Sequence, residues 1–289
     1  MAFEKVSAMH PDKLADRIGG AILDLAYSKQ EDPKVALEIM IGHGRCIIVN
    51  ETNCHLNTSE IQPIIDRIVY PGIVLEYIEV PQDPHLAKNQ AEMIKAGDNG
   101  ISKAYPMTDE EKTLAKITEA LDKKFGKDGK YILDNGTPNS TLNNKDLIVC
   151  QSNATEQEIT DFLKTLNITK KNGYNIKVNP LGDWTGSIGV DCGCGNRKLG
   201  SDMGNSITGG GLHLKDLSKP DVSVNIYLWL KAQKENRILK AYWAIGDTQI
   251  HIMDNLVDYS EIVTISREYI KNLGGFEKFA EYGLIRACN

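Results

Sequence analysis

One supersecondary pattern occurs three times along this sequence of 289 residues. Each occurrence begins with a helix of regular apolar period, continues with two strands of alternating character, and adds a second helix. The leading helices begin near residues 11, 109 and 218, so the spacing is close to even. The pattern predicts an α/β (α+β) fold of α-β-β-α-β units, in which helices cover one face of a mixed sheet. The expected helices are 11–29, 58–70, 109–126, 155–166, 218–235 and 259–272, and the expected strands are 35–42, 45–51, 73–80, 130–133, 146–151, 174–179, 238–246 and 249–254.

The starts of the leading helices carry recognisable signals. Pro-Asp opens the first and the third, as Pro11-Asp12 and Pro220-Asp221. Proline suits a first helical turn because its missing N–H would have no partner there anyway. Thr108 stands as an N-cap before three acidic residues at the second. The sheet faces that the helices leave uncovered are partly apolar, so a second subunit is the expected cover.

The charge balance bounds the kinds of partner. The chain has 33 Lys and Arg against 39 Asp and Glu, a formal net charge of −6. General nucleic-acid binders usually carry a basic surplus, so we expect no nucleic acid as a partner. No apolar run is long enough to span a bilayer, and the first residues lack the apolar core of a signal peptide. We therefore expect a cytoplasmic protein without a membrane partner.

The six cysteines include one close pair, Cys192 and Cys194, in a C-x-C arrangement. No second pair stands at zinc-finger spacing. Two interpretations are open for this pair. It forms a metal or redox site, or it consists of reduced thiols in a glycine-rich loop, which a cytoplasmic setting favours.

The segment HPDK at residues 10–13 places three chemically active side chains at the start of the first predicted helix. A helix start carries positive dipole character and free N–H groups, which suit an anion. His10 adds a donor of adjustable charge, Asp12 a hard oxygen ligand for Mg²⁺, and Lys13 a positive charge. The combination is typical of a site for polyphosphate and its metal, although a helix start without a ligand uses the same residue types.

A basic, glycine-rich region occupies part of the second half of the chain. It begins at Asp191 with DCGCGNRK, continues with three glycines at 209–211, and ends with KDLSKPD from Lys215 to Asp221. Arginine offers a forked donor to phosphate oxygens, and lysine a compact charge. Three glycines are compatible with a flexible linker, but the basic residues on both sides favour a phosphate-binding loop.

Together these segments resemble the signatures of the S-adenosylmethionine synthetase (methionine adenosyltransferase) family. The family's corresponding stretches read approximately GHPDK, GDCGLTGRK and GGGAFSGKDPSKVDRS. The resemblance runs nearly from end to end, and the chain is shorter than the family's usual members. Weaker matches follow in the same order: Glu38 in ALEIM, Glu51 after a strand, Gln82, GDNG at 97–100 and AYWAIG at 241–246.

The resemblance implies three α/β domains around a pseudo-threefold axis, approximately residues 1–98, 99–182 and 183–289, with some segments exchanged. It implies an enzyme that makes S-adenosylmethionine from ATP and L-methionine, with Mg²⁺ and K⁺ as cofactors. The methionine sulfur attacks C5′ of ATP, and the released triphosphate is hydrolysed to pyrophosphate and phosphate. The family's sheets pack face to face in a homodimer with shared active sites, and a tetramer is a further option.

The resemblance also implies roles for individual residues. His10 lies beside the departing 5′ oxygen, Asp191 bridges methionine and nucleoside, and Lys219 reaches methionine or phosphate. The resemblance implies that the triphosphate is bound, and catalysis supported, by Arg197, Lys198 and Lys215, that Trp184 stacks on adenine, and that Leu212 lies in the nucleoside pocket. It implies methionine contacts from Glu51, Gln82, Asp191 and Lys219, and an interface position for Asp98. The implied metal ligands are Asp12 and Asp221 for Mg²⁺ and Glu38 for K⁺.

Several of these residues have plainer interpretations when taken singly. Glu38 fits a solvent-facing position in an alternating strand, and Trp184 fits a core. Glu51 and Gln82 fit polar loop edges. The expected mobile loops are 81–98, 134–145 and 183–213. Within the first of them, the segment 82–98 matches the family's flexible active-site loop in shortened form.

Three departures from the family pattern bear on activity. The family's central domain usually carries a D-x-K segment whose lysine binds polyphosphate. The best local match is the segment 134–136, which lacks the lysine, and Lys130 substitutes for it only with a shifted strand register. Asp183 precedes Trp184 where many members carry arginine, and Leu212 replaces a small residue after the three glycines. The missing lysine bears most directly on triphosphate hydrolysis.

Two alternatives to the synthetase activity follow from these departures. One is a non-catalytic homologue that binds ATP or methionine and regulates a partner. The other is an enzyme of different outcome, either a triphosphatase or a synthetase for a methionine analogue. Loss of catalysis usually removes charged site residues. This chain keeps most of them, so the synthetase is the favoured hypothesis.

Overall fold

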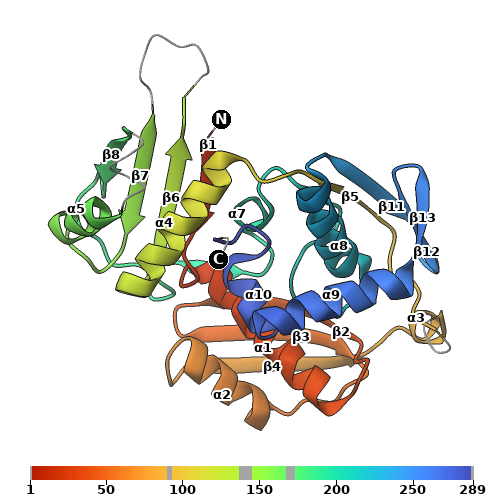
Figure 1. The fold of residues 1–289 in the computed structure, drawn as a ribbon. Helices are drawn as coiled ribbons and strands as arrows, with labels where there is room; N and C mark the ends of the chain where they lie inside the picture. Colours follow the sequence, from red (N-terminus) through yellow and green to blue (C-terminus); the bar gives the residue numbers. More distant parts are fainter. Residues whose placement is uncertain (1, 90–92, 137–144, 167–172, 288–289) are drawn as a thin grey trace.

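The computed structural model describes residues 2–89, 93–136, 145–166 and 173–287. Three sheets with packed helices form the frame of the molecule (Figure 1). The helices are α1 (Pro11–Lys29), α2 (Thr58–Ile68), α3 (Pro84–Asn89), α4 (Asp109–Phe125), α5 (Glu156–Thr165), α7 (Leu199–Met203), α8 (Pro220–Glu235), α9 (Tyr259–Leu273) and α10 (Phe276–Tyr282).

Each sheet is named after its place along the chain. The N-terminal sheet has the order β4 (Val74–Pro81), β3 (Arg45–Thr52), β2 (Val35–Gly42) and β9 (Cys192–Cys194). The central sheet has the order β1 (Ala2–Val6), β6 (Gly129–Asp134), β7 (Asp146–Gln151) and β8 (Asn175–Val178). The C-terminal sheet has the order β10 (Ile207–Thr208), β5 (Gly100–Ala104), β11 (Leu239–Trp243), β12 (Gln249–Ile252) and β13 (Asn255–Asp258).

Every helix and strand predicted from periodicity is present, with ends shifted by a few residues at most. The predicted α/β class is therefore confirmed. The helix starts also follow the expected chemistry. Thr108 accepts a hydrogen bond from the N–H of Glu111, whose carboxylate in turn accepts from the N–H of Thr108 at 2.7 Å. This reciprocal capping box satisfies two N–H groups that a helix start leaves free.

Periodicity misses the short elements. β1 lacks a clean alternation because Lys5 is fully buried in it and donates to the carbonyl oxygens of Ser201 and Tyr282. The segments expected to be mobile loops contain α3, β9, α7 and β10 instead, all of six residues or fewer. Part of the remaining expected loop, residues 137–144, lies outside the described residues. Short elements carry too few residues for a period to be recognised.

Strands from distant parts of the chain complete all three sheets. β1 pairs antiparallel with β6, β5 pairs antiparallel with β11, and β9 pairs antiparallel with β2. A sheet therefore does not correspond to one continuous third of the chain. The domain boundaries near residues 98 and 182 stay a prediction.

Helix α1 lies at the centre of this arrangement, between the N-terminal sheet and α10 (Figure 1). Gly20 permits the close contact with α10, because a Cβ added there would lie 2.6 Å from the carbonyl oxygen of Phe276. The start of α1 faces β9, which brings the HPDK turn against the basic region of the second half.

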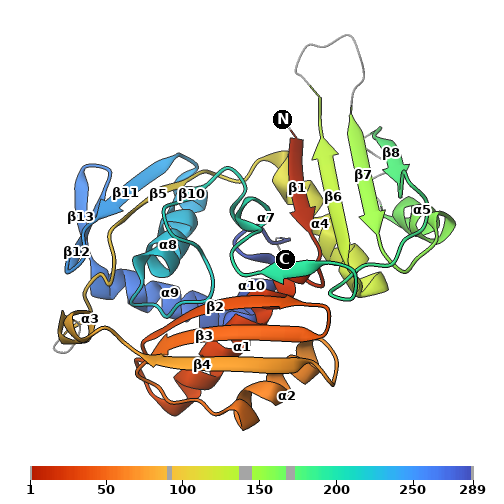
Figure 2. The same cartoon turned by 180° about the vertical axis from the view of Figure 1, so that it is seen from behind.

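The N-terminal sheet has one uncovered face. Helices α1 and α2 pack on the other face, and the view from behind shows the strands in front of both helices (Figure 2). The uncovered face, here called the outer face, carries large exposed apolar side chains, namely Met40, Ile47, Val49, Val74 and Ile78. Within the described ranges, every helix is too short or too polar to cross a membrane.

Candidate functional site

The HPDK turn forms a capped helix start. His10 is the N-cap of α1, and its Nδ1 accepts a hydrogen bond from the backbone N–H of Asp12 at 3.2 Å. Pro11 takes the first helical position. Because Nδ1 acts as an acceptor, the neutral ring carries its hydrogen on Nε2. The turn therefore retains a histidine N–H donor for another partner.

The segment 192–198, here called the arginine loop, is held on α1 by two carboxylates one helical turn apart. Asp12 Oδ1 accepts from the N–H of Cys194, and Asp16 Oδ1 accepts from the N–H of Asn196, both at 2.8 Å. Gly193 permits this contact, since a Cβ there would lie 2.0 Å from the carbonyl oxygen of Pro11. This packing fixes the position of the arginine loop relative to the HPDK turn.

Two cations of the arginine loop lie near Asp12 without forming short ion pairs with it. Arg197 Nη1 lies 3.6 Å from Asp12 Oδ1, and Lys198 Nζ lies 3.5 Å from Asp12 Oδ2. These distances exceed those of charge-assisted hydrogen bonds. The Arg197 side chain is 60% exposed, whereas Asp12 is 3% exposed. Arg197 and Lys198 are thus available to an anion larger than a single carboxylate.

His10 is neutral near pH 7. Burial and the neighbouring ammonium of Lys198 lower the pKa of His10 to about 4, despite the opposing charges of Asp12 and Asp191. A neutral imidazole donates through Nε2 without adding charge. The site therefore combines fixed cations with one neutral donor.

A second charged pair lies on the segment 209–215, here called the glycine loop, and on the start of α8. Lys215 Nζ is 2.7 Å from Asp221 Oδ2. The other oxygen of Asp221, Oδ1, is buried and has no hydrogen-bond partner among the described residues. Burial raises the pKa of Asp221, and the nearby Asp98 carboxylate raises it further while Lys215 opposes. An unpartnered hard oxygen beside a second carboxylate suits a bound cation.

Glu38 lies between these two groups. It projects from β2 onto the outer face, opposite Val49 of β3. Burial raises the pKa of the Cys194 thiol, and the charge of Glu38 raises it further. Burial lowers the pKa of Lys215, but the charge of Asp221 chiefly, and that of Glu38 to a smaller extent, raise it. Glu51 shares the outer face and accepts a long hydrogen bond of 3.4 Å from the N–H of Asp83. The outer face therefore carries acidic groups next to its apolar ones.

The chain is similar to S-adenosylmethionine synthetases in sequence and in structure. Residues 1–77 match the S-adenosylmethionine synthetase N-terminal domain. The S-adenosylmethionine synthase of Wolinella succinogenes is 31% identical over 148 residues, 44% of this chain and 38% of that protein. The synthase of Helicobacter acinonychis is 36% identical over 70 residues, 23% of this chain and 18% of that protein. The aligned part thus spans well under half of these curated relatives.

A solved structure covers nearly the whole chain. The structure described as an unusual S-adenosylmethionine synthetase from Campylobacter jejuni superposes with a TM-score of 0.72, over 98% of this chain and 94% of that one, at 18% identity. The chain has the S-adenosylmethionine synthetase fold. The resemblance inferred from the sequence motifs is confirmed, and the low identity marks this chain as divergent.

Some residues expected from the synthetase resemblance lie apart from the group around Asp12. Leu212 is fully buried in the core. Trp184 is half-buried at the end of the central sheet, where it lines an open pocket of about 650 Å³ with residues 153–155. None of the residues around Asp12 lines that pocket. Asp191 is exposed and near His10.

The remaining synthetase-like positions are exposed or half-buried. Asp98 is exposed, and its charge acts on Lys215 and Asp221 of its own chain. Lys219 is the N-cap residue of α8, immediately before Pro220. Gln82 follows β4 and is half-buried.

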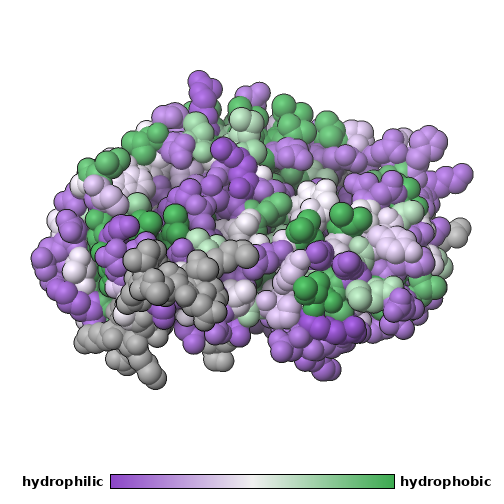
Figure 3. All heavy atoms as spheres, turned by 90° about the horizontal axis from the view of Figure 1, so that it is seen from above, coloured by the Kyte–Doolittle hydropathy of each residue, from purple (hydrophilic) through white to green (hydrophobic). Residues whose placement is uncertain are grey.

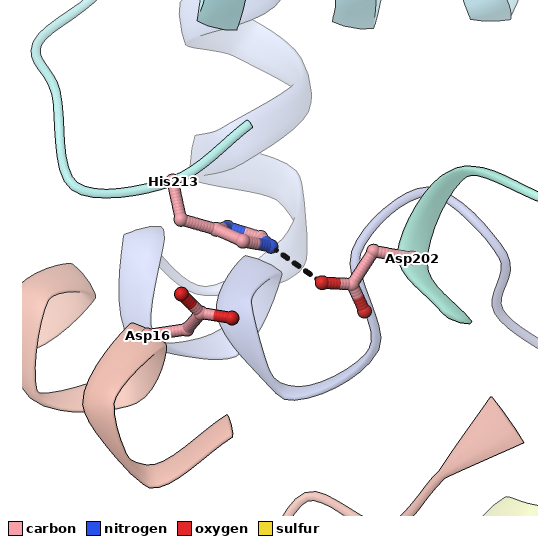
Figure 4. A group of neighbouring side chains, drawn as sticks. All are labelled: Asp16, Asp202 and His213. Atoms are coloured by element: carbon pink, nitrogen blue, oxygen red, sulfur yellow. Dashed lines mark hydrogen bonds and ion pairs between the residues drawn. The ribbon is translucent and has the colours of Figure 1, made fainter. Parts of the chain in front are cut away.

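Lys13, expected from the sequence to offer charge to polyphosphate, points into the interior instead. Its Nζ lies 3.1 Å from Asp16 Oδ2 and 2.5 Å from Asp202 Oδ2, and all three side chains are buried. Among the described residues, the side chains close enough to hold a metal are Asp16, Asp202 and His213, which converge in Figure 4. The Lys13 ammonium, 3.4 Å from His213 Nε2, already supplies the positive charge that this group needs.

A D-x-K segment absent from the sequence prediction lies close to the HPDK turn. Asp128-Gly129-Lys130 fits the pattern in its own letters, at the start of β6. Lys130 lies near enough to His10 to lower its pKa, in addition to burial and Lys198, and Asp128 is near enough to Asp12 for their charges to interact. The segment 134–136 was thus the wrong match, since it lies at the opposite end of β6. The tertiary fold brings Lys130 near His10 without a shift of register, and the Lys130 ammonium pairs with the Glu4 carboxylate at 3.0 Å.

Proposed function

We propose that this protein is a methionine adenosyltransferase, which makes S-adenosylmethionine from ATP and L-methionine. The single observation that carries the proposal is the buried Asp12 carboxylate, with Arg197 and Lys198 loosely around it and neutral His10 beside it. A metal-bound triphosphate requires a metal ligand together with cations whose hydrogen-bonding capacity is still available. The fold supports the same activity.

The proposed chemistry needs alignment and charge stabilisation more than a base. The thioether of methionine is already a nucleophile, so its attack on C5′ requires no proton removal. Negative charge grows on the departing triphosphate, where Arg197 and Lys198 stabilise it. The His10 Nε2–H donates to the departing 5′ oxygen. Lys130, Lys198 and Lys215 then support cleavage of the triphosphate to pyrophosphate and phosphate.

The chain offers oxygen ligands that fit Mg²⁺ and K⁺. Asp12 and Asp221 are the proposed Mg²⁺ ligands, and the partnerless, buried Oδ1 of Asp221 supports this assignment. Glu38 is the proposed K⁺ ligand, because it is an exposed carboxylate between the arginine and glycine loops. Bound Mg²⁺ would neutralise phosphate charge and orient the triphosphate.

The substrate contacts are proposed by similarity. Methionine would contact Glu51 and Gln82, with Lys219 at its carboxylate or at phosphate. Asp191 would bridge the methionine amine and the nucleoside. Trp184 offers a half-buried ring for adenine and lines a pocket of about 650 Å³. The fully buried Leu212 would act by shaping the glycine loop from beneath.

We further propose that the protein acts as a cytoplasmic homodimer, or a tetramer of two such dimers, joined through the outer face. Five large apolar side chains are exposed there, and water contact with so much apolar surface is unfavourable. Glu38 and Glu51 lie on the same face, so a partner covering it would also enclose these acidic groups. On the face seen from above, apolar groups lie in several separate places (Figure 3).

One incubation tests the activity. Purified protein is mixed with ATP, methionine, Mg²⁺ and K⁺, and the products are separated by chromatography. S-adenosylmethionine with pyrophosphate and phosphate supports the proposal. Tripolyphosphate accumulation indicates that the hydrolytic step is absent. ATP binding without any turnover supports the regulatory homologue instead.

A mixing experiment tests the shared site. If Glu51 of one subunit faces Arg197 of the other, inactive Glu51→Ala and inactive Arg197→Ala proteins should regain activity together. Every mixed dimer then carries both lesions in one site and leaves the other intact. No recovery despite measured subunit exchange would place the whole site within one chain.

A further inference from the structure

Asn196 connects the two loops that carry the cations of the candidate site. Its Oδ1 accepts hydrogen bonds from the N–H groups of Leu212 and His213, both at 3.0 Å. Its Nδ2 donates to the carbonyl oxygen of His213 at 3.2 Å. One amide of the arginine loop thus makes three hydrogen bonds to the backbone of the glycine loop.

The backbone at Asn196 explains why this residue type fits. Asn196 has φ +60°, a left-handed conformation that asparagine adopts more readily than most residues. Its N–H donates to Asp16, so the conformation is held from the α1 side. The family stretch GDCGLTGRK carries glycine at the corresponding place, which suits the same conformation but offers no side chain. In this chain the asparagine takes the left-handed conformation and adds an amide that reaches the glycine loop.

The glycine loop is shaped to receive the amide. Gly211 has φ +143°, and a Cβ added to it would lie 3.0 Å from Asn196 Nδ2 and 3.1 Å from Cγ. Any larger residue at this position would push against the amide. The third glycine of the triplet and Asn196 therefore form a matched pair across the two loops.

The connection determines the spacing of three cations. Asn196 directly precedes Arg197 and Lys198, and the His213 that it contacts lies two residues before Lys215. These cations stand on separate loops and must meet one anion together. Misplacement of such groups by about 1 Å costs as much as roughly 100-fold in rate.

We propose that Asn196 is a positioning residue that sets the spacing between the arginine loop and the glycine loop for a triphosphate. The inference rests on the proposed function, because it assigns the two loops to the same polyphosphate. Asn196 acts through Arg197, Lys198 and Lys215 and need not contact the ligand itself.

The test replaces Asn196 by glycine, which keeps the left-handed backbone and removes only the amide. Asn236→Gly is the matched control, since Asn236 has φ +50°, is exposed, and ends α8 away from both loops. Binding of inorganic tripolyphosphate with Mg²⁺, and of L-methionine, is measured by calorimetry. We expect Asn196→Gly to weaken tripolyphosphate binding roughly 10-fold. Methionine affinity should stay unchanged, and Asn236→Gly should alter neither.

Thermal unfolding of both variants separates positioning from structure. A lower Tm for Asn196→Gly with wild-type tripolyphosphate affinity would overturn the proposal, because the amide would then serve stability alone. Equal loss of tripolyphosphate and methionine binding would also overturn it. Wild-type protein that binds tripolyphosphate but makes no S-adenosylmethionine would refute the proposed enzyme and leave the comparison of variants valid. Wild-type protein that does not bind tripolyphosphate would refute both.

Discussion

Two groups of charged side chains meet at the first turns of α1, and they are built differently. In the open group, Arg197 and Lys198 lie 3.6 and 3.5 Å from Asp12, and Arg197 is largely exposed. In the closed group, Lys13 lies 3.1 Å from Asp16 and 2.5 Å from Asp202, with all three buried. Neighbouring residues of one motif, Asp12 and Lys13, thus belong to different environments.

The difference shows how one helix start serves both binding and folding. Successive helical residues point about 100° apart, so Asp12 and Lys13 cannot share a surface. Two carboxylates balance the charge of the Lys13 ammonium and raise its pKa despite its burial. The cations around Asp12 keep unused hydrogen-bonding capacity. Only the open group can therefore accept a ligand.

Replacing Lys13 by methionine should have the largest effect. The change leaves Asp16 and Asp202 buried without their counter-charge, which costs about 3–5 kcal/mol in the free energy of unfolding. Urea denaturation measures this loss. The matched variant Lys198→Met should change stability little, since Lys198 contacts Asp12 only at 3.5 Å. Similar losses in both variants would erase the distinction between the two groups.

Replacing Arg197 by alanine should affect activity and leave the fold unchanged. The side chain is 60% exposed, so its removal opens no cavity. We expect kcat to fall roughly 100-fold through lost stabilisation of the departing triphosphate. Steady-state kinetics with ATP and methionine, next to a thermal melt, provides the measurement. Near-normal turnover would remove Arg197 from the site.

Asp12→Asn sharpens the metal assignment. The asparagine Oδ1 can still accept from the N–H of Cys194, so the arginine loop should stay on α1. Loss of the negative charge should raise the Mg²⁺ concentration for half-maximal activity roughly 10-fold. A Mg²⁺ titration of activity tests this. An unchanged titration curve would contradict the role of Asp12 as a metal ligand.

The smallest expected effect concerns the pH dependence of stability. Because the pKa of His10 is about 4 in the folded chain and near 6.5 when unfolded, the unfolded chain binds the proton first on acidification. The stability contributed by His10 is complete above pH 6.5 and is lost as the pH falls towards 4. His10→Asn keeps an N-cap and removes this titration. Between pH 7 and about 5.5, wild type should lose about 1 kcal/mol more than the variant in urea unfolding. Equal losses would show that His10 titrates normally.

The sequence predicts most regular elements, because their hydrophobic periods extend over enough residues to be recognised. The capping box at Thr108 and the proline-led starts of α1 and α8 follow from local chemistry alone. The HPDK segment and the basic region of the second half are also recognisable together from the sequence, although Asp12 and Cys192 lie 180 positions apart in the chain. Those features depend on local composition and order.

Other features were missed because they depend on contacts between distant segments. The sequence predicts that Lys13 offers its charge to polyphosphate, yet Lys13 is buried against Asp202, and Lys5 is buried against Ser201. The sequence predicts that Lys130 reaches the site only with a shifted strand register, whereas the pairing of β1 with β6 brings His10 close to it in the observed register. The hydrogen bonds of Asn196 have no sequence signal beyond a departure from the family's glycine.

The sequence by itself determined the kinds of element, their order, and the residue types available for binding a metal-bound anion. Those properties arise from period, capping and side-chain chemistry, all of which act within a few residues. Only the tertiary structure decided which charges are open and which are closed. Burial and charge pairing depend on which distant segment packs against α1: α7 supplies the Asp202 carboxylate that holds Lys13, and β9 supplies the Cys194 N–H that donates to Asp12.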